Sequence, residues 1–170
     1  MRPLKRTEIK RFFEQLPPLK REIIFCLANI DKPANVGSII RLAEGLSAKV
    51  WLCGKTPIPP DPLISVTSMN QEVRVDWQHF TFAHEAIQEA KNQGYRTVAV
   101  EICKEAQFYA QYKYPQKICF VLGNENTGVH QEILSICDDA LFIPYYGKNY
   151  SYNVAISAAM VVSRACFGSA

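Results

Sequence analysis

The sequence predicts an α/β fold in which a parallel, Rossmann-like sheet carries helices on both faces. Apolar, strand-like runs alternate with helical patterns along the 170 residues, and strands that alternate with helices usually pair in parallel beneath them. The run at residues 22–29 is almost continuously apolar, as a strand buried on both faces is. A hydrophobic fraction of 48% and a charged fraction of 21% are typical of a globular domain.

The individual elements follow from local patterns. Strands are predicted over residues 22–29, 49–53, 95–102, 118–122 and 140–144. Helices are predicted over residues 7–16, 36–43, 82–92, 130–137 and 153–166. Asn35 is expected to cap the second helix and Gly94 to close the third. Residues 57–62 are rich in proline and predict a loop, whereas residues 63–75 fit neither pattern.

The length favours one domain with a substantial core, preceded by a basic helical extension over residues 1–21. That extension holds seven basic side chains against two acidic ones, although the net charge of the whole chain is only +3. Such a segment suits a polyanion such as nucleic acid, but a solvated helix face explains it equally well. Its basic residues are Arg2, Lys5, Arg6, Lys10, Arg11, Lys20 and Arg21.

Several classes of protein are disfavoured. No apolar run approaches the roughly 20 residues that cross a bilayer, and the basic N-terminus lacks the apolar segment of a signal peptide, so we expect a soluble, cytoplasmic protein. The six cysteines are scattered, with no C-x-x-C pair, and are expected to be reduced and mostly buried. The three histidines do not cluster with them, so no metal is expected. A G-x-G-x-x-G fingerprint and a P-loop are both missing, which disfavours a dinucleotide or a nucleoside triphosphate.

Three connections between a strand and a helix carry unusual residues. In the first, Asn35, Gly37 and Arg41 form an N-x-G-x-x-x-R pattern, and Gly37 is expected to leave space beneath the Arg41 guanidinium for a large ligand. In the second, residues 122–128 place two glycines around a carboxylate directly after a buried strand, so that the backbone can approach a ligand closely. A surface arginine and a plain turn are equally good explanations of these two segments taken singly.

The third connection covers residues 141–154, where an apolar run ends at Pro144 and a loop leads into an Ala-rich helical pattern. Ser151 and Asn153 are good N-cap types, so an ordinary capped helix is the simplest explanation of this segment alone. In a parallel sheet, however, all three connections leave from the carboxyl ends of the strands. They are therefore predicted to converge on one pocket.

Together and in this order, the three segments resemble the signature motifs of the SpoU (TrmH-type) RNA 2′-O-ribose methyltransferases of the SPOUT superfamily. The second matches G-x-E-x-x-G at Gly123, Glu125 and Gly128, and the third matches I-P-M…S-L-N-V at residues 143–154. The likeness spans residues 23–165. Two positions depart from it, since Tyr145 replaces the expected methionine and Tyr152 the expected leucine. Tyr152 falls where the family lines its adenine pocket, so cofactor affinity is the property that this departure affects.

The resemblance implies a C-terminal trefoil knot, a methyltransferase domain over residues 22–170 and S-adenosylmethionine as cofactor. The end of the strand near residues 100–103 would form one wall of the cofactor pocket. The residues that would hold the cofactor are Leu122, Gly123, Asn124, Glu125, Ile143, Pro144, Tyr146, Ser151, Tyr152 and Asn153.

The implied activity is 2′-O-methylation of RNA, with tRNA favoured over rRNA because the chain has no room for the extra RNA-binding domain of several rRNA members. The catalytic residues would be Arg41, Asn35, Glu125, Ser151 and Asn153. We favour Arg41 as a clamp on the adjacent phosphate, since arginine stays protonated and is a poor base. RNA would also contact the seven basic residues of the N-terminal extension.

The family dimerises through its last helix, where this chain has many small residues: Ala155, Ser157, Ala158, Ala159, Ser163 and Ala165. A homodimer is therefore expected. Two alternatives stay open. One is a non-catalytic RNA-binding relative that has lost cofactor affinity through Tyr152, and the other is a flavodoxin-like nucleotide-binding protein of another family.

Overall fold

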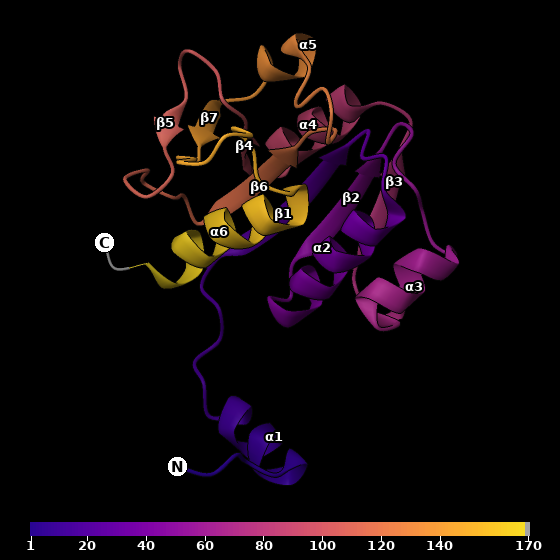
Figure 1. The fold of residues 1–170 in the computed structure, drawn as a ribbon, viewed down its shortest axis with the longest axis vertical. Helices are drawn as coiled ribbons and strands as arrows, with labels where there is room; N and C mark the ends of the chain where they lie inside the picture. Colours follow the sequence, from indigo (N-terminus) through magenta and orange to yellow (C-terminus); the bar gives the residue numbers. More distant parts are fainter. Residues whose placement is uncertain (169–170) are drawn as a thin grey trace.

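The computed structural model describes residues 1–168 and shows an α/β fold on one seven-stranded sheet whose strands all pair in parallel (Figure 1). The strands are β1 (Glu22–Ala28), β2 (Lys49–Cys53), β3 (Trp77–Phe80), β4 (Arg96–Val100), β5 (Gln107–Phe108), β6 (Lys117–Leu122) and β7 (Asp139–Phe142). They lie in the order β3-β2-β1-β6-β4-β7-β5. The helices are α1 (Arg6–Glu14), α2 (Pro33–Gly45), α3 (Pro62–Ser68), α4 (Ala83–Asn92), α5 (Gln131–Leu134) and α6 (Val154–Phe167), with a 3₁₀ turn η1 (Gln71–Val73).

The sheet is covered on both faces, as the sequence predicts. Alternate side chains of β1 point to opposite sides, so that Phe25 and Leu27 join the core with α2, α3 and α6, while Ile24 and Cys26 join the core with α4. Every residue of β1 after Glu22 is buried. This two-sided burial explains why the β1 sequence is continuously apolar rather than alternating.

The five predicted strands are confirmed, and their ends differ from the prediction by two residues at most. Two edge strands were not predicted. β3 is half exposed and reads W-Q-H-F, and β5 is only two residues long, so neither has the apolar run that marks a buried strand. The helix predicted over residues 130–137 is wrong in extent, because α5 is a single turn. Residues 63–75 contain most of α3 and the turn η1.

The prediction that Asn35 caps α2 is also wrong. The helix begins at Pro33, after the cap residue Lys32, because the fixed φ of proline suits the first helical position. Asn35 therefore lies inside the first turn, and its side chain is directed into the protein, where the residue is 7% exposed. Asn153, by contrast, caps α6 as expected, since its side chain accepts hydrogen bonds from the N–H groups of Ala155 and Ile156.

The helix α1 lies away from the sheet, at the end of an extended segment (Figure 1), and none of its residues is buried. The segment that joins it to β1 ends at Arg21. The guanidinium of Arg21 donates hydrogen bonds to the carbonyl oxygens of Ala165 (2.5 Å), Tyr114 (2.7 Å) and Pro115 (2.5 Å). Arg21, a predicted RNA-binding residue, is thus engaged in anchoring the start of the sheet to the end of α6.

The cysteines form no disulfide. Cys26, Cys53 and Cys119 are fully buried in the core beneath α4, which confirms the prediction for these three, while Cys103, Cys137 and Cys166 are half-buried. Within residues 1–168, no three His, Cys, Asp or Glu side chains gather closely enough to hold a metal ion. In the same part of the chain, every helix is too short or too polar to cross a membrane.

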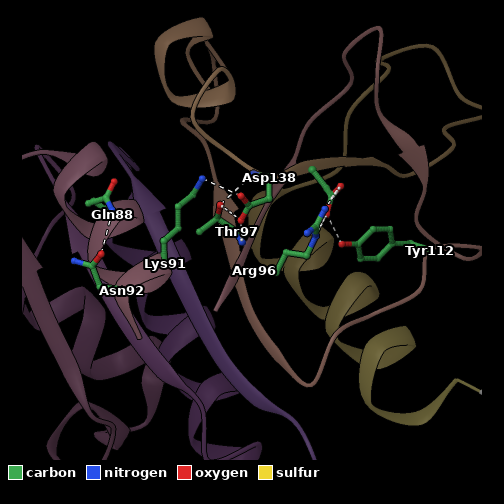
Figure 2. A network of polar contacts seen from close by, with 8 residues as sticks. Gln88, Lys91, Asn92, Arg96, Thr97, Tyr112 and Asp138 are labelled. Carbon is green, nitrogen blue, oxygen red and sulfur yellow. Dashed lines mark hydrogen bonds and ion pairs between the residues drawn. The ribbon is translucent and has the colours of Figure 1, made fainter. Parts of the chain in front are cut away.

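A polar network ties β7 to β4 and α4 at the amino ends of the strands (Figure 2). Asp138 accepts hydrogen bonds from the N–H and the hydroxyl of Thr97, both at 2.8 Å, and pairs with Lys91 at 2.9 Å. Asp139 pairs with Arg96 and accepts a hydrogen bond of 2.6 Å from the hydroxyl of Tyr112. These contacts fix the position of β7, and β7 leads into the loop of the third motif.

The pKa values of both carboxyl groups are lowered. For Asp139, the hydrogen bond from Arg96 is the main cause of the lower pKa. For Asp138, partial burial acts to raise the pKa, but the hydrogen bonds from Thr97 and Lys91 outweigh it.

We expect Asp138→Ala to lower the free energy of unfolding by about 1–3 kcal/mol at pH 7, because Thr97 and Lys91 lose their acceptor. A lowered folded pKa means that the carboxylate stabilises the fold above its ordinary pKa of about 4, and that this stabilisation is lost as the pH falls through the lower folded value. The difference between wild type and variant should therefore shrink as the pH falls below about 4. Urea unfolding followed by circular dichroism measures it.

Glu105→Ala is the matched control, because Glu105 is exposed and makes no hydrogen bond or ion pair within residues 1–168. A stability difference for Asp138→Ala that grows as the pH falls below about 4 would contradict this assignment of the carboxylate.

Candidate active site

A cavity of ≈ 610 Å³ opens at the carboxyl ends of β4, β6 and β7. Residues 100–102, 122–128, 141–143 and 149–154 line it, together with Lys32, Asn35 and Ser157. The predicted convergence of the three motifs on one pocket is thus what the structure shows. The volume lies in the range of about 300–1,000 Å³ that small-molecule sites occupy.

A chain of side-chain hydrogen bonds joins the three motifs beside this cavity. The Asn35 amide donates to Glu125 Oε1 at 2.6 Å, and the Asn153 amide donates to Asn35 Oδ1 at 2.9 Å. Glu125 also accepts hydrogen bonds from the N–H groups of Asp31 (2.9 Å) and Lys32 (3.2 Å), directly before α2. One buried amide therefore links the start of α2, the turn after β6 and the start of α6.

Glu125 is held in its ionised form. Partial burial acts to raise its pKa, but the hydrogen bonds from Asp31, Asn35 and Lys32 outweigh it, so that the pKa is lowered. A negative charge next to the first turn of α2 is also favoured by the partial positive charge of a helix N-terminus. Glu125 is therefore a fixed carboxylate on the wall of the cavity.

The turn between β6 and α5 is closed on itself. Asn124 and Gly128 exchange two backbone hydrogen bonds of 3.1 and 2.9 Å, and the Asn124 side chain accepts from the N–H groups of Asn126 and Thr127. A side chain on Gly123 would collide with the backbone of Gly128, and one on Gly128 would collide with the Glu101 carboxylate. These glycines therefore let the two sides of the turn approach each other closely, and they let the Glu101 carboxylate pack against the turn.

Glu101 was not among the predicted catalytic or cofactor-binding residues, although it lies in the segment predicted as a wall. Its carboxylate accepts hydrogen bonds from the N–H groups of Val129 (2.7 Å) and Ile102 (2.8 Å) and lines the cavity. Lys32, Asn149, Tyr150 and Ser157 also line the cavity and were not predicted. Of these residues, only Glu101 carries a sequence signal, because it is a carboxylate directly after the buried strand β4.

Tyr152 is half-buried beside the cavity. Its hydroxyl donates to the Pro144 carbonyl at 3.2 Å, and its ring meets the Tyr145 ring edge to face, with centroids 4.7 Å apart. The phenol is thus held against its own loop, and the cavity keeps its volume of ≈ 610 Å³ with Tyr152 in place.

Most of the residues predicted to hold a cofactor line this cavity: Leu122, Gly123, Asn124, Glu125, Ile143, Ser151, Tyr152 and Asn153. Pro144, Tyr146 and Cys103 are not among the lining residues. The catalytic candidates Asn35, Glu125, Ser151 and Asn153 meet here, whereas Arg41 does not line the cavity. Arg41 is exposed on α2, and its side chain makes no hydrogen bond or ion pair with any residue from 1 to 168.

The expectation for Gly37 is wrong. A side chain at this position would collide with Thr67 and with the carbonyl of Ile64, so that α3 fills the space that was expected to be open beneath Arg41. Gly37 lets α2 and α3 pack closely. Arg41 instead lies one helical turn after Ser38, which lines a shallow groove between α2 and α6.

Comparisons with known proteins agree with this geometry. The SpoU rRNA Methylase family matches residues 22–163. The chain belongs to the SpoU rRNA methylase family. Its similarity to the tRNA (guanosine(18)-2′-O)-methyltransferase of Escherichia coli (strain K12) is 27% identity over 163 residues, which covers 94% of this chain and 69% of that protein. Membership in this family makes the alternative of a flavodoxin-like nucleotide-binding protein wrong.

Solved structures share the fold of this SpoU-family chain. An RNA methyltransferase assigned to the TrmH family from Porphyromonas gingivalis matches with a TM-score of 0.78 and 25% identity, over 91% of this chain and 62% of that one. An AdoMet-bound rRNA methyltransferase from Sinorhizobium meliloti matches with a TM-score of 0.80 and 23% identity, over 88% of this chain and 57% of that one. This chain therefore spans less than two thirds of either solved chain.

In this SpoU-family site, we expect Asn35→Asp to be more destabilising than Asn35→Ala at pH 7. The new carboxylate would face Glu125 at hydrogen-bond distance, and two adjacent carboxylates cannot both ionise readily, so the pKa of the pair rises above the ordinary value of about 4. A raised folded pKa gives stability that is present at low pH and is lost as the pH rises through it. Asn35→Asp should therefore gain stability relative to Asn35→Ala as the pH falls from 8 to 5.

Urea unfolding midpoints of the two variants and the wild type, taken across that range, give the result. Equal pH dependence of Asn35→Asp and Asn35→Ala would show that residue 35 and Glu125 are not in contact.

Proposed function

We propose that this chain transfers a methyl group from S-adenosylmethionine to a ribose 2′-oxygen of RNA. The observation that carries the proposal is the single cavity on which all three family motifs converge, joined through Asn35. The names of its relatives support the same chemistry, since they are RNA methyltransferases acting on tRNA and rRNA.

The cavity suits the proposed cofactor. Apolar side chains of Val100 and Ile102 line the cavity and can pack against a flat base, and the carboxylates of Glu101 and Glu125 can face a cationic ligand. Residues 123–128 also line the cavity and add polar groups for the ribose and the amino-acid part. When bound, S-adenosylmethionine would supply an electrophilic methyl group on its sulfonium.

The chain's own residues would hold the ribose and exclude water rather than form a covalent bond. Orientation of two reactants can contribute about 7–11 kcal/mol to a barrier, and the rigid Glu125–Asn35–Asn153 chain fixes the groups around the cavity mouth. Ser151 lines the cavity with an exposed hydroxyl-bearing side chain and can hydrogen-bond the ribose. We keep Arg41 as a phosphate clamp, since its free guanidinium suits a bidentate contact with phosphate.

Three further parts of the proposal concern the architecture and setting of the enzyme. One is the trefoil knot of the C-terminal third. Another is a methyltransferase domain over residues 22–170, preceded by the basic extension of residues 1–21. The last two residues of this domain, Ser169 and Ala170, lie outside the described residues. The last is a cytoplasmic location, in keeping with tRNA or rRNA as substrate.

We also propose a homodimer. A groove between α2 and α6 is lined by Leu42, Ile156, Ala159 and Met160, and Ile156 is 52% exposed. Small residues on α6 permit close helix approach in such an interface. Arg41 lies between Ser38 and Leu42, which line this groove, so a second copy packed there would approach the Arg41 helix of each chain.

Among RNA substrates we favour tRNA. The tRNA (guanosine(18)-2′-O)-methyltransferase of Escherichia coli matches 94% of this chain at 27% identity, whereas the Sinorhizobium meliloti rRNA enzyme, at 23% identity, shows the fold alone. The basic side chains of the extension, Arg21 excepted, lie on an exposed segment and suit a phosphate backbone.

The test is transfer of labelled methyl groups to unfractionated tRNA and, separately, to rRNA, followed by digestion to nucleosides. We expect a 2′-O-methylnucleoside from tRNA. Arg41→Ala should lower the rate roughly 10- to 100-fold, as expected for the loss of a charge-assisted hydrogen bond. Arg74→Ala is the matched control, because Arg74 is also exposed and its one ion pair is long, at 4.0 Å.

Methylation of a base rather than a ribose would refute the proposed reaction. Equal rates for the wild type, Arg41→Ala and Arg74→Ala would remove Arg41 from the site.

A further inference from the structure

The loop of residues 144–152 contains four tyrosines in two sets. Tyr145 and Tyr152 point inward, pack against each other edge to face and are half-buried. The Tyr152 hydroxyl is bonded to the Pro144 carbonyl, and the Tyr145 ring lies so close to Gly147 that a side chain there would collide with it. This inner pair gives the loop a support of its own.

The other two tyrosines point outward. Tyr146 is 97% exposed and Tyr150 is 73% exposed, and neither hydroxyl has a hydrogen-bond partner among residues 1–168. Tyr150 also has a φ of +61°, a left-handed conformation that is rare and unfavourable for a bulky residue. Both rings are left in solvent and are therefore available to a ligand.

The position of the outer pair suggests which ligand. Tyr150 lines the cavity, and so does Ile102, which is 62% exposed. Lys148 lies between the two outer tyrosines in sequence, is exposed and makes no ion pair within the described chain of 168 residues. Flat aromatic faces beside a free ammonium group match an unpaired nucleotide, whose base stacks and whose phosphate is anionic.

We propose that Tyr146 and Tyr150, with Lys148, form a stacking platform for unpaired RNA bases next to the ribose that is methylated. The platform rests on the proposed function for its place beside the acceptor ribose. A base within a duplex has no free face, whereas bases in loops can be splayed onto aromatic side chains. The preferred substrate is therefore an unpaired segment of RNA rather than a helix.

The test compares binding of a fluorescein-labelled single-stranded oligouridylate with binding of a blunt RNA duplex, by fluorescence anisotropy with the full chain. Tyr146→Ala and Tyr150→Ala should each weaken single-strand binding roughly 5- to 100-fold, the range for one lost stacking contact. Tyr146→Phe and Tyr150→Phe should stay within about threefold of wild type, because the ring is kept. Binding of the duplex should be weaker and unchanged by any of the four variants.

Phe82→Ala is the matched control, since Phe82 is also an exposed aromatic, at 55%, at the start of α4. Circular dichroism shows that each variant is folded. The proposal is overturned if the alanine variants bind the single strand as the wild type does, if the phenylalanine variants lose as much as the alanine ones, or if the wild type prefers the duplex. It is overturned as well if the alanine variants change the sedimentation coefficient of the protein rather than its RNA binding, since the tyrosines would then form a protein interface.

Failure of the proposed reaction is detected separately. A chain that shows tyrosine-dependent binding of single strands but no methyl transfer would keep the platform and lose the enzyme. A chain that methylates RNA but binds single strands equally well without the two tyrosines would keep the proposed reaction and refute the platform.

Discussion

The side-chain amide of Asn35 is the contact on which the site depends. It is almost fully buried, and both of its polar atoms are bonded, one to Glu125 and one to Asn153. A buried polar group left without a partner is costly, so the three segments that carry these residues must keep one arrangement. Those segments follow β1, β6 and β7, and their loops enclose the cavity. The candidate site residues and the loops that carry them are thus held by the same hydrogen bonds.

Sequence patterns identified the centre of this molecule better than its edges. β1 and β6 were predictable because burial on both faces demands continuous apolar residues, and α6 because Asn153 is a strong cap before an Ala-rich run. β3 and β5 were not predicted, because a short edge strand does not need a continuous apolar run. Motif spacing and the family resemblance predicted many of the residues that line the cavity. They could not show that Asn35 points inward, since Pro33 moves the helix start, or that α3 fills the space beside Gly37, since that contact joins distant parts of the chain.

Under the proposed function, the surface around the cavity divides the tasks of a nucleic-acid enzyme among separate groups. Fixed carboxylates of Glu101 and Glu125 lie within the cavity, where a cationic ligand belongs. Free cationic and aromatic side chains, including Arg41, Lys148 and Tyr146, lie outside it, where phosphates and bases belong. The departures from the family motif at Tyr145 and Tyr152 form the inner support of the same loop. These two substitutions need not lower the affinity of the cavity for a cofactor, because both rings pack against the loop itself.

Isothermal titration calorimetry of the purified chain shows whether the cavity beside Asn35 binds S-adenosylmethionine. We expect one site per chain with a dissociation constant in the micromolar range, a common range for enzyme substrates. Asn35→Ala should weaken binding by about tenfold or more, whereas Asn92→Ala, which removes an exposed amide on α4 bonded only to Gln88, should bind as the wild type does. No heat of binding from the folded wild type would contradict the account and leave an RNA-binding relative without catalysis.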